Sequence, residues 1–195
     1  NSRISLSNND SGDGNTIFGK SAGANLDAGS NYNVFIGEEV SDATMNDALD
    51  NVGVGYRSLG ALTSGDSNTA LGSNALIAVT SGLRNTAIGK GAGLALGVGG
   101  NNVFIGEASG DATDTDSSGN VAIGKDAYGG SHTGTACHYN VAIGQGALLG
   151  AMNGVSGAVA VGKSALAALT TGAGNTAVGY LAATDISTGI GNTVV

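Results

Sequence analysis

Asn85-Thr-Ala-Ile-Gly89 is the stretch that decides the fold, because versions of it recur along the chain. The copies begin at Asn15, Asn33, Asn51, Asn68, Asn85, Asn102, Asn120, Asn140, Ala158, Asn175 and Asn192. Successive copies start 17 to 20 residues apart. A short unit repeated at a nearly constant period indicates an array in which each unit packs mainly on its neighbours.

The five positions of the motif differ in character. Position one is Asn in every copy except the one at Ala158, and position two is always Thr or Val. Position three is mostly Ala, position four is always a larger apolar residue, and position five is Gly wherever the copy reaches it. Alternating side chains over a few residues are typical of a β-strand.

Turn-forming residues fill the rest of each unit, which predicts an all-β fold. Gly, Ser, Thr, Asp and Asn dominate segments such as residues 170–174, and these residues favour turns. Residues 164–169 are too short for a stable helix, so we expect a second strand or a bent segment there. One strand plus turns makes one coil of a parallel β-solenoid, with about ten coils over residues 15–195 and a leading segment at 1–14. Stacking would align the asparagines in an amide ladder and the glycines at a tight corner.

The larger apolar residues at position four are the predicted coil core. This set is Phe18, Ile36, Val54, Leu71, Ile88, Ile105, Ile123, Ile143, Val161 and Val178. Position three would then face away from the core, yet it is never polar or charged. Because an exposed strand position normally collects polar residues, we predict that position three lines the axis of a homotrimer. The predicted axis residues are Ile17, Phe35, Ala70, Ala87, Phe104, Ala122, Ala142, Ala160 and Ala177.

Composition and charge narrow the class of protein. The formal net charge of −8, without a basic stripe, argues against nucleic-acid binding. No apolar run is long enough to span a membrane, and the one cysteine, Cys137, excludes an internal disulfide framework. The chain has no initiator Met and stops within a repeat, so we expect it to be part of a longer protein.

The repeats resemble a known family. Asn-Val-Ala-Ile-Gly at Asn120 and Asn140, and Asn-Thr-Ala-Val-Gly at Asn175, look like the head repeats of trimeric autotransporter adhesins, which are YadA-like. Similar repeats occur in bacteriophage tail fibres and tail spikes. The resemblance covers residues 15–195 and implies a left-handed, trimeric β-roll in surface attachment. The longer repeat, with Thr or Val where the adhesins use Ser, favours the phage fibre.

The longest repeat contains both histidines and the cysteine. His132, Cys137 and His138 are candidate metal ligands by chemistry, but their spacing is not that of a standard zinc finger. We therefore expect an exposed loop with no metal and no cofactor. Because loops on rigid scaffolds carry recognition, His132, His138 and Tyr139 are the candidate receptor contacts.

Two acidic turns, at residues 10–15 and 111–116, have carboxylates at short spacing that could suit Ca²⁺. Neither matches a known calcium loop, so we expect solvated turns instead.

The functional expectation is a fibre protein of a virion, or of another extracellular surface, that attaches to a host. Its partners would be two further copies of itself, other subunits of the same structure, and a host glycan or protein receptor. A bacterial adhesin head is the alternative. A hexapeptide-type acyltransferase is less favoured, because only one side of each coil obeys the hexad rule and no catalytic grouping recurs, so we expect no enzyme activity. An ice-binding solenoid is also less favoured, because the Thr column alternates with Val and is expected to face inward.

Overall fold

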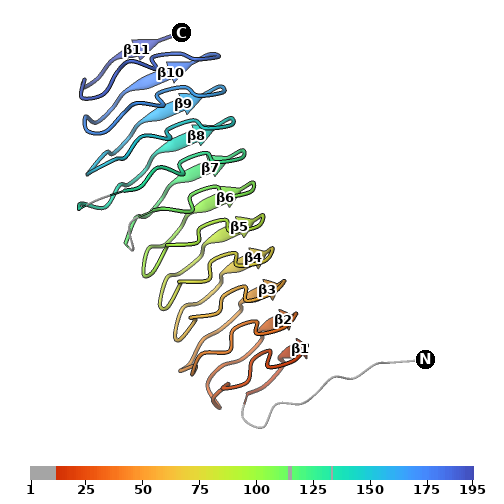
Figure 1. Ribbon diagram of the computed structural model, residues 1–195. Helices are drawn as coiled ribbons and strands as arrows, with labels where there is room; N and C mark the ends of the chain where they lie inside the picture. The colour runs from red at the N-terminus through yellow and green to blue at the C-terminus, as the bar shows by residue number, and fades with distance from the viewer. Residues whose placement is uncertain (1–11, 114–115, 133) are drawn as a thin grey trace.

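The computed structural model describes residues 12–113, 116–132 and 134–195, which form a parallel β-solenoid (Figure 1). The strands are Thr16–Phe18 (β1), Val34–Ile36 (β2), Val52–Val54 (β3), Thr69–Leu71 (β4), Thr86–Ile88 (β5), Val103–Ile105 (β6), Val121–Ile123 (β7), Val141–Ile143 (β8), Val159–Val161 (β9), Thr176–Val178 (β10) and Thr193–Val194 (β11). They form one sheet in chain order, and the described residues form no helix. The predicted all-β solenoid is therefore confirmed.

The register of the sheet stacks equivalent repeat positions. Ile88 pairs with Leu71 below it and Ile105 above it, and the same alignment holds from β1 to β11. With strands about 4.8 Å apart, ten steps give a stack roughly 50 Å long. Figure 1 shows the strands aligned on one side of this stack, with the two ends of the array far apart.

The predicted asparagine ladder is present inside the coils. From Asn33 to Asn140, each side-chain amide donates to the side-chain oxygen of the asparagine one coil earlier, at 3.0 to 3.2 Å. The same amide also donates to a backbone carbonyl near the end of its own coil, as Asn85 does to Gly99 at 2.9 Å. Ala158 interrupts the ladder, which resumes as the pair Asn175 and Asn192.

The segment after each strand is a chain of turns with left-handed backbone. The position-five glycines have positive φ, for example 137° at Gly89, which confirms the predicted tight corner. A Cβ at Gly89 would lie 2.4 Å from the carbonyl oxygen of Gly106, so glycine is also required for coil stacking. Positions seven and nine also have positive φ, as at Ser164 and Leu166. Repeated left-handed residues bend this segment, so the second strand that we considered at residues 164–169 does not form.

The two faces of the strands are the reverse of the prediction. Position three points into the coil: its residues from Phe35 to Ala177 are buried, and Ile17 packs against the same core. Position four points outward: Phe18 is 61% exposed and Ile88 is 40% exposed. The prediction that Phe18, Ile36, Val54, Leu71, Ile88, Ile105, Ile123, Ile143, Val161 and Val178 form the coil core was therefore wrong. The prediction that Ile17, Phe35, Ala70, Ala87, Phe104, Ala122, Ala142, Ala160 and Ala177 line a trimer axis was also wrong.

The width of the coil explains this reversal. The interior is filled mainly from the turns, by position nine and by position twelve or thirteen, for example Leu76 and Val79. These long side chains leave little space beneath the strand, so position three is usually Ala. Where position three is Phe104, position nine of the same coil is Gly110, whose Cβ would lie 2.7 Å from the ring. Small residues at position three therefore reflect a narrow interior and not an axial contact.

Candidate interaction surfaces

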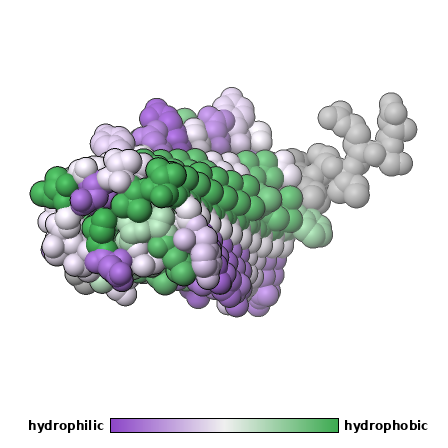
Figure 2. All heavy atoms as spheres, turned by 90° about the horizontal axis from the view of Figure 1, so that it is seen from above, coloured by the Kyte–Doolittle hydropathy of each residue, from purple (hydrophilic) through white to green (hydrophobic). Residues whose placement is uncertain are grey.

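An uncharged apolar band covers the outer face of the sheet. We call it the outer stripe, and define it as positions two and four of every copy. Position two supplies Thr16, Val34, Val52, Thr69, Thr86, Val103, Val121, Val141, Val159, Thr176 and Thr193; position four supplies Phe18, Ile36, Val54, Leu71, Ile88, Ile105, Ile123, Ile143, Val161, Val178 and Val195. Figure 2 shows this band as a continuous hydrophobic track along the array.

The outer stripe is exposed because no other segment of the described residues covers it. All of its residues are half-buried or exposed, while the alternate position between them is inside the coil. Continuous apolar surface of this length is unusual on a monomer, so the outer stripe is a candidate interaction site. The mixture of Thr and Val at position two was the sequence signal for an outward column, because a buried column would seldom alternate between a hydroxyl and a methyl group.

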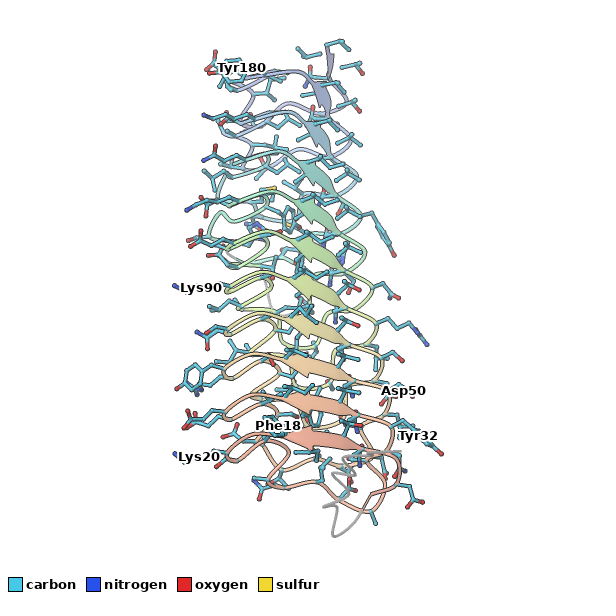
Figure 3. All side chains as sticks on the ribbon, turned by 90° about the vertical axis from the view of Figure 1, so that its right-hand side faces the viewer. Phe18, Lys20, Tyr32, Asp50, Lys90 and Tyr180 are labelled. Atoms are coloured by element: carbon cyan, nitrogen blue, oxygen red, sulfur yellow. The ribbon has the colours of Figure 1, made fainter. Side chains whose placement is uncertain are left out.

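One edge of the sheet carries position six, which holds all four lysines of the chain. Lys20 donates to Glu38 at 3.0 Å and Lys125 to Glu107 at 3.1 Å, each between neighbouring coils. The hydrogen bond to Glu38 raises the pKa of Lys20, and Glu107 does the same for Lys125. Figure 3 shows Lys20, Lys90 and Tyr180 projecting from this edge. Because Glu38 and Glu107 lie between the lysines, the edge is a mixed-charge column.

The opposite edge carries the residue that precedes each motif. Tyr32 and Tyr139 are 63% and 73% exposed there, and Figure 3 shows Tyr32 and Asp50 on this side. A Cβ on Gly14 would lie 2.8 Å from the Tyr32 ring, and one on Gly119 would lie 2.7 Å from the Tyr139 ring. Each tyrosine therefore packs over a glycine of the preceding coil.

The predicted receptor-contact loop is divided between the interior and the surface. His132 is buried, so it is not a surface contact in this structure, whereas Tyr139 is exposed as predicted. His138 is half-buried and its Nδ1 accepts a hydrogen bond from the backbone amide of Ser118 at 3.1 Å. The rings of His138 and Tyr139 lie 6.1 Å apart, so these two residues do share one surface.

Metal-ligand geometry is absent from the described ranges. Residues 12–113, 116–132 and 134–195 contain no group of three or more His, Cys, Asp or Glu side chains that could hold a metal ion. The Cys137 thiol is buried, and its Sγ donates to the carbonyl oxygen of Thr135 at 3.8 Å. Of the two acidic turns, Asp10 and Asp114 lie outside the described residues. Burial raises the pKa of Asp111.

No helix within the described ranges is long and apolar enough to cross a membrane. Comparisons with protein-family models, with curated proteins and with solved structures found no match to this chain.

Proposed function

We propose that this chain is the shaft or head of a homotrimeric attachment fibre, with three outer stripes facing one another around a central axis. The outer stripe is the observation that carries the proposal. Each copy has the same stripe, so self-association buries three apolar surfaces together. Neither column of the stripe contains a charged side chain that would have to be desolvated.

The stripe suits a partner that repeats at the spacing of the strands. Its two columns run the full length of the array, roughly 50 Å at about 4.8 Å per strand. A parallel copy of the same array places an equivalent pair of outer-stripe residues opposite each strand. A globular partner with an irregular surface does not. Neither column of the stripe contributes to the formal net charge of −8, and a net charge of this size favours solubility of such rods.

The role in attachment rests on the resemblance of the repeats to those of surface fibres. We favour a left-handed array in a phage tail fibre, located on the virion, which holds or forms a receptor-binding part. The receptor would be a host-surface glycan or protein, with Tyr139 and His138 as candidate contacts. The head of a bacterial trimeric adhesin is the alternative. In either case the role is structural and adhesive, without catalysis.

Native mass is the first test of the trimer. Light scattering should give three times the chain mass of 18.7 kDa. Ile88→Glu places a charge in the middle of the stripe, and we expect it to give monomers with an intact fold by circular dichroism. Leu94→Glu is the matched control, because Leu94 has similar exposure, 41%, outside the stripe. A monomeric wild type, or a trimeric Ile88→Glu variant, would contradict the proposal that the outer stripes face one another around a trimer axis.

Attachment is tested separately with the labelled trimer. We expect saturable binding to some members of a panel of bacterial cells, and weaker binding by a Tyr139→Ala trimer. A stable trimer that binds neither cells nor a glycan array would be consistent with a trimeric rod and would contradict a receptor-binding role.

An ice-binding surface is the second candidate, because the Thr column faces outward and not inward as expected. Thr16, Thr69, Thr86, Thr176 and Thr193 lie on a regular sheet, although the neighbouring column is entirely apolar. We expect no thermal hysteresis. A clear thermal hysteresis signal from a monomeric wild type that Thr86→Lys abolishes would favour ice binding over the trimer.

A further inference from the structure

His132 occupies a position in the hydrophobic core that most other coils fill with an apolar residue. It is the thirteenth residue of its repeat, and the same column holds Leu96 two coils earlier and Met152 in the next coil. Its side chain is 8% exposed. Its ring meets the ring of Tyr128 edge-on, with centroids 4.6 Å apart.

Neither ring nitrogen of His132 has a hydrogen-bond partner among the described residues. Nδ1 and Nε2 are both buried and unpaired, while the backbone amide donates to Ala112 at 3.2 Å. A buried polar atom without a partner costs free energy, and a buried charge without a partner costs much more. The neutral ring is therefore tolerated in the folded coil, and the imidazolium is not.

Among the described residues, no charged group compensates a proton on this ring. Tyr128 and Cys137 are the titratable residues of the same coil interior, and both are neutral at acidic pH. The coil before contributes Thr113 to the column and the coil after contributes Met152. Glu107, Asp111, Asp116 and Asp126 are the described carboxylates of this coil and of the coil before it. None of them forms an ion pair with His132, and burial lowers the pKa of His132 to about 4.

The coil that contains His132 has unusual packing around it. It is the longest repeat, with 20 residues from Asn120 to Tyr139. Tyr128 crosses its interior: the hydroxyl donates to the Cys137 carbonyl at 3.4 Å and accepts from the Asn140 side chain at 3.2 Å. Movement of His132 would therefore disturb the contact of Tyr128 with the asparagine ladder.

We propose that this coil is an acid-sensitive segment, which opens when His132 is protonated while the coils further away stay folded. Because coils contact only their neighbours, opening at one coil need not unfold the array. In the open form the imidazole is hydrated and has its ordinary pKa near 6.5. As pH falls from that value toward about 4, the open form binds the proton first, so opening becomes more favourable.

Hydrogen exchange measured region by region tests the proposal on the full chain. We compare neutral pH with a pH just below 4, after correcting for the intrinsic pH dependence of exchange. In the wild type, amides of residues 120–140 should lose protection by about tenfold or more on acidification, while residues 52–90 keep theirs. His132→Met, which restores an apolar residue of this column, should keep protection in both regions.

His138→Met is the matched control, because His138 belongs to the same repeat but is only half-buried and uses Nδ1 as an acceptor. It should behave as the wild type. Equal protection of residues 120–140 at both pH values would overturn the proposal, and so would the same loss in His132→Met. If His132→Met does not fold, the test is an NMR titration of the His132 imidazole in the folded wild type. A titration midpoint at 6 or above overturns the proposal.

Discussion

At the scale of single residues, the asparagine ladder holds the coils together. Asn85 donates to the Asn68 side chain and to the Gly99 carbonyl, and its oxygen accepts from the backbone amide and side chain of Asn102. Asn85→Ala removes these partners inside the coil. Each polar group left unpaired costs about 1 to 3 kcal/mol, so we expect a loss of about 3 kcal/mol. Urea unfolding measures this loss, with Asn46→Ala, at an exposed asparagine outside the ladder, as the control. If Asn85→Ala lowers the free energy of unfolding no more than the control does, water replaces the hydrogen bonds of the Asn85 side chain.

At the scale of the coil, the sizes of interior residues are matched across the strand and the turn. In one coil the large Phe104 at position three packs beside Gly110 at position nine, and in a later coil the small Ala160 at position three accompanies the larger Leu166 at position nine. Phe104→Ala leaves a cavity and should cost about 3 to 5 kcal/mol. Gly110→Leu should also destabilise, because its side chain would overlap the Phe104 ring. The double variant should recover most of the stability, because leucine at this position adopts the required positive φ in other coils, as at Leu166. A double-mutant cycle from urea unfolding measures the coupling, and additive losses would contradict the size match.

The same coil shows how far the sequence predicts the fold. The spacing of the repeats, the period-two pattern and the asparagine and glycine columns were sufficient to predict a parallel solenoid, its strands and its ladder. The faces of the strands were not predictable from residue size, because Ile88 is larger than Ala87 and yet lies outside. The interior volume is fixed by turn residues such as Leu76, and their direction depends on left-handed backbone that the sequence does not signal at non-glycine positions. His132 was misplaced for the same reason: the local sequence resembles a loop, but the register places it in a core column.

At the scale of the whole molecule, each coil contacts only the coils next to it. The least stable contact between two coils should therefore determine where the array unfolds first. The ladder runs unbroken from Asn15 to Asn140, and then Ala158 has no side-chain oxygen to accept from Asn175. The Asn175 amide keeps the usual bond to a carbonyl of its own coil, here Gly189, and donates to the Gly172 carbonyl in place of a side-chain oxygen. We therefore expect residues 159–195 to exchange faster than residues 16–54, which are equally near an end of the array but have an intact ladder.

Ala158→Asn tests whether the missing rung causes this difference. The new side chain would accept from Asn175, and by analogy with Asn85 and Gly99 its amide would reach the Gly172 carbonyl. A typical hydrogen bond contributes about 1 kcal/mol, so protection of residues 159–195 should rise by about fivefold to tenfold, with little change in residues 16–54. In a linear array a stronger junction also joins the segments into one cooperative unit, so urea unfolding should become steeper. Unchanged exchange would mean that fraying at the end, and not the interrupted ladder, sets the stability of the last coils.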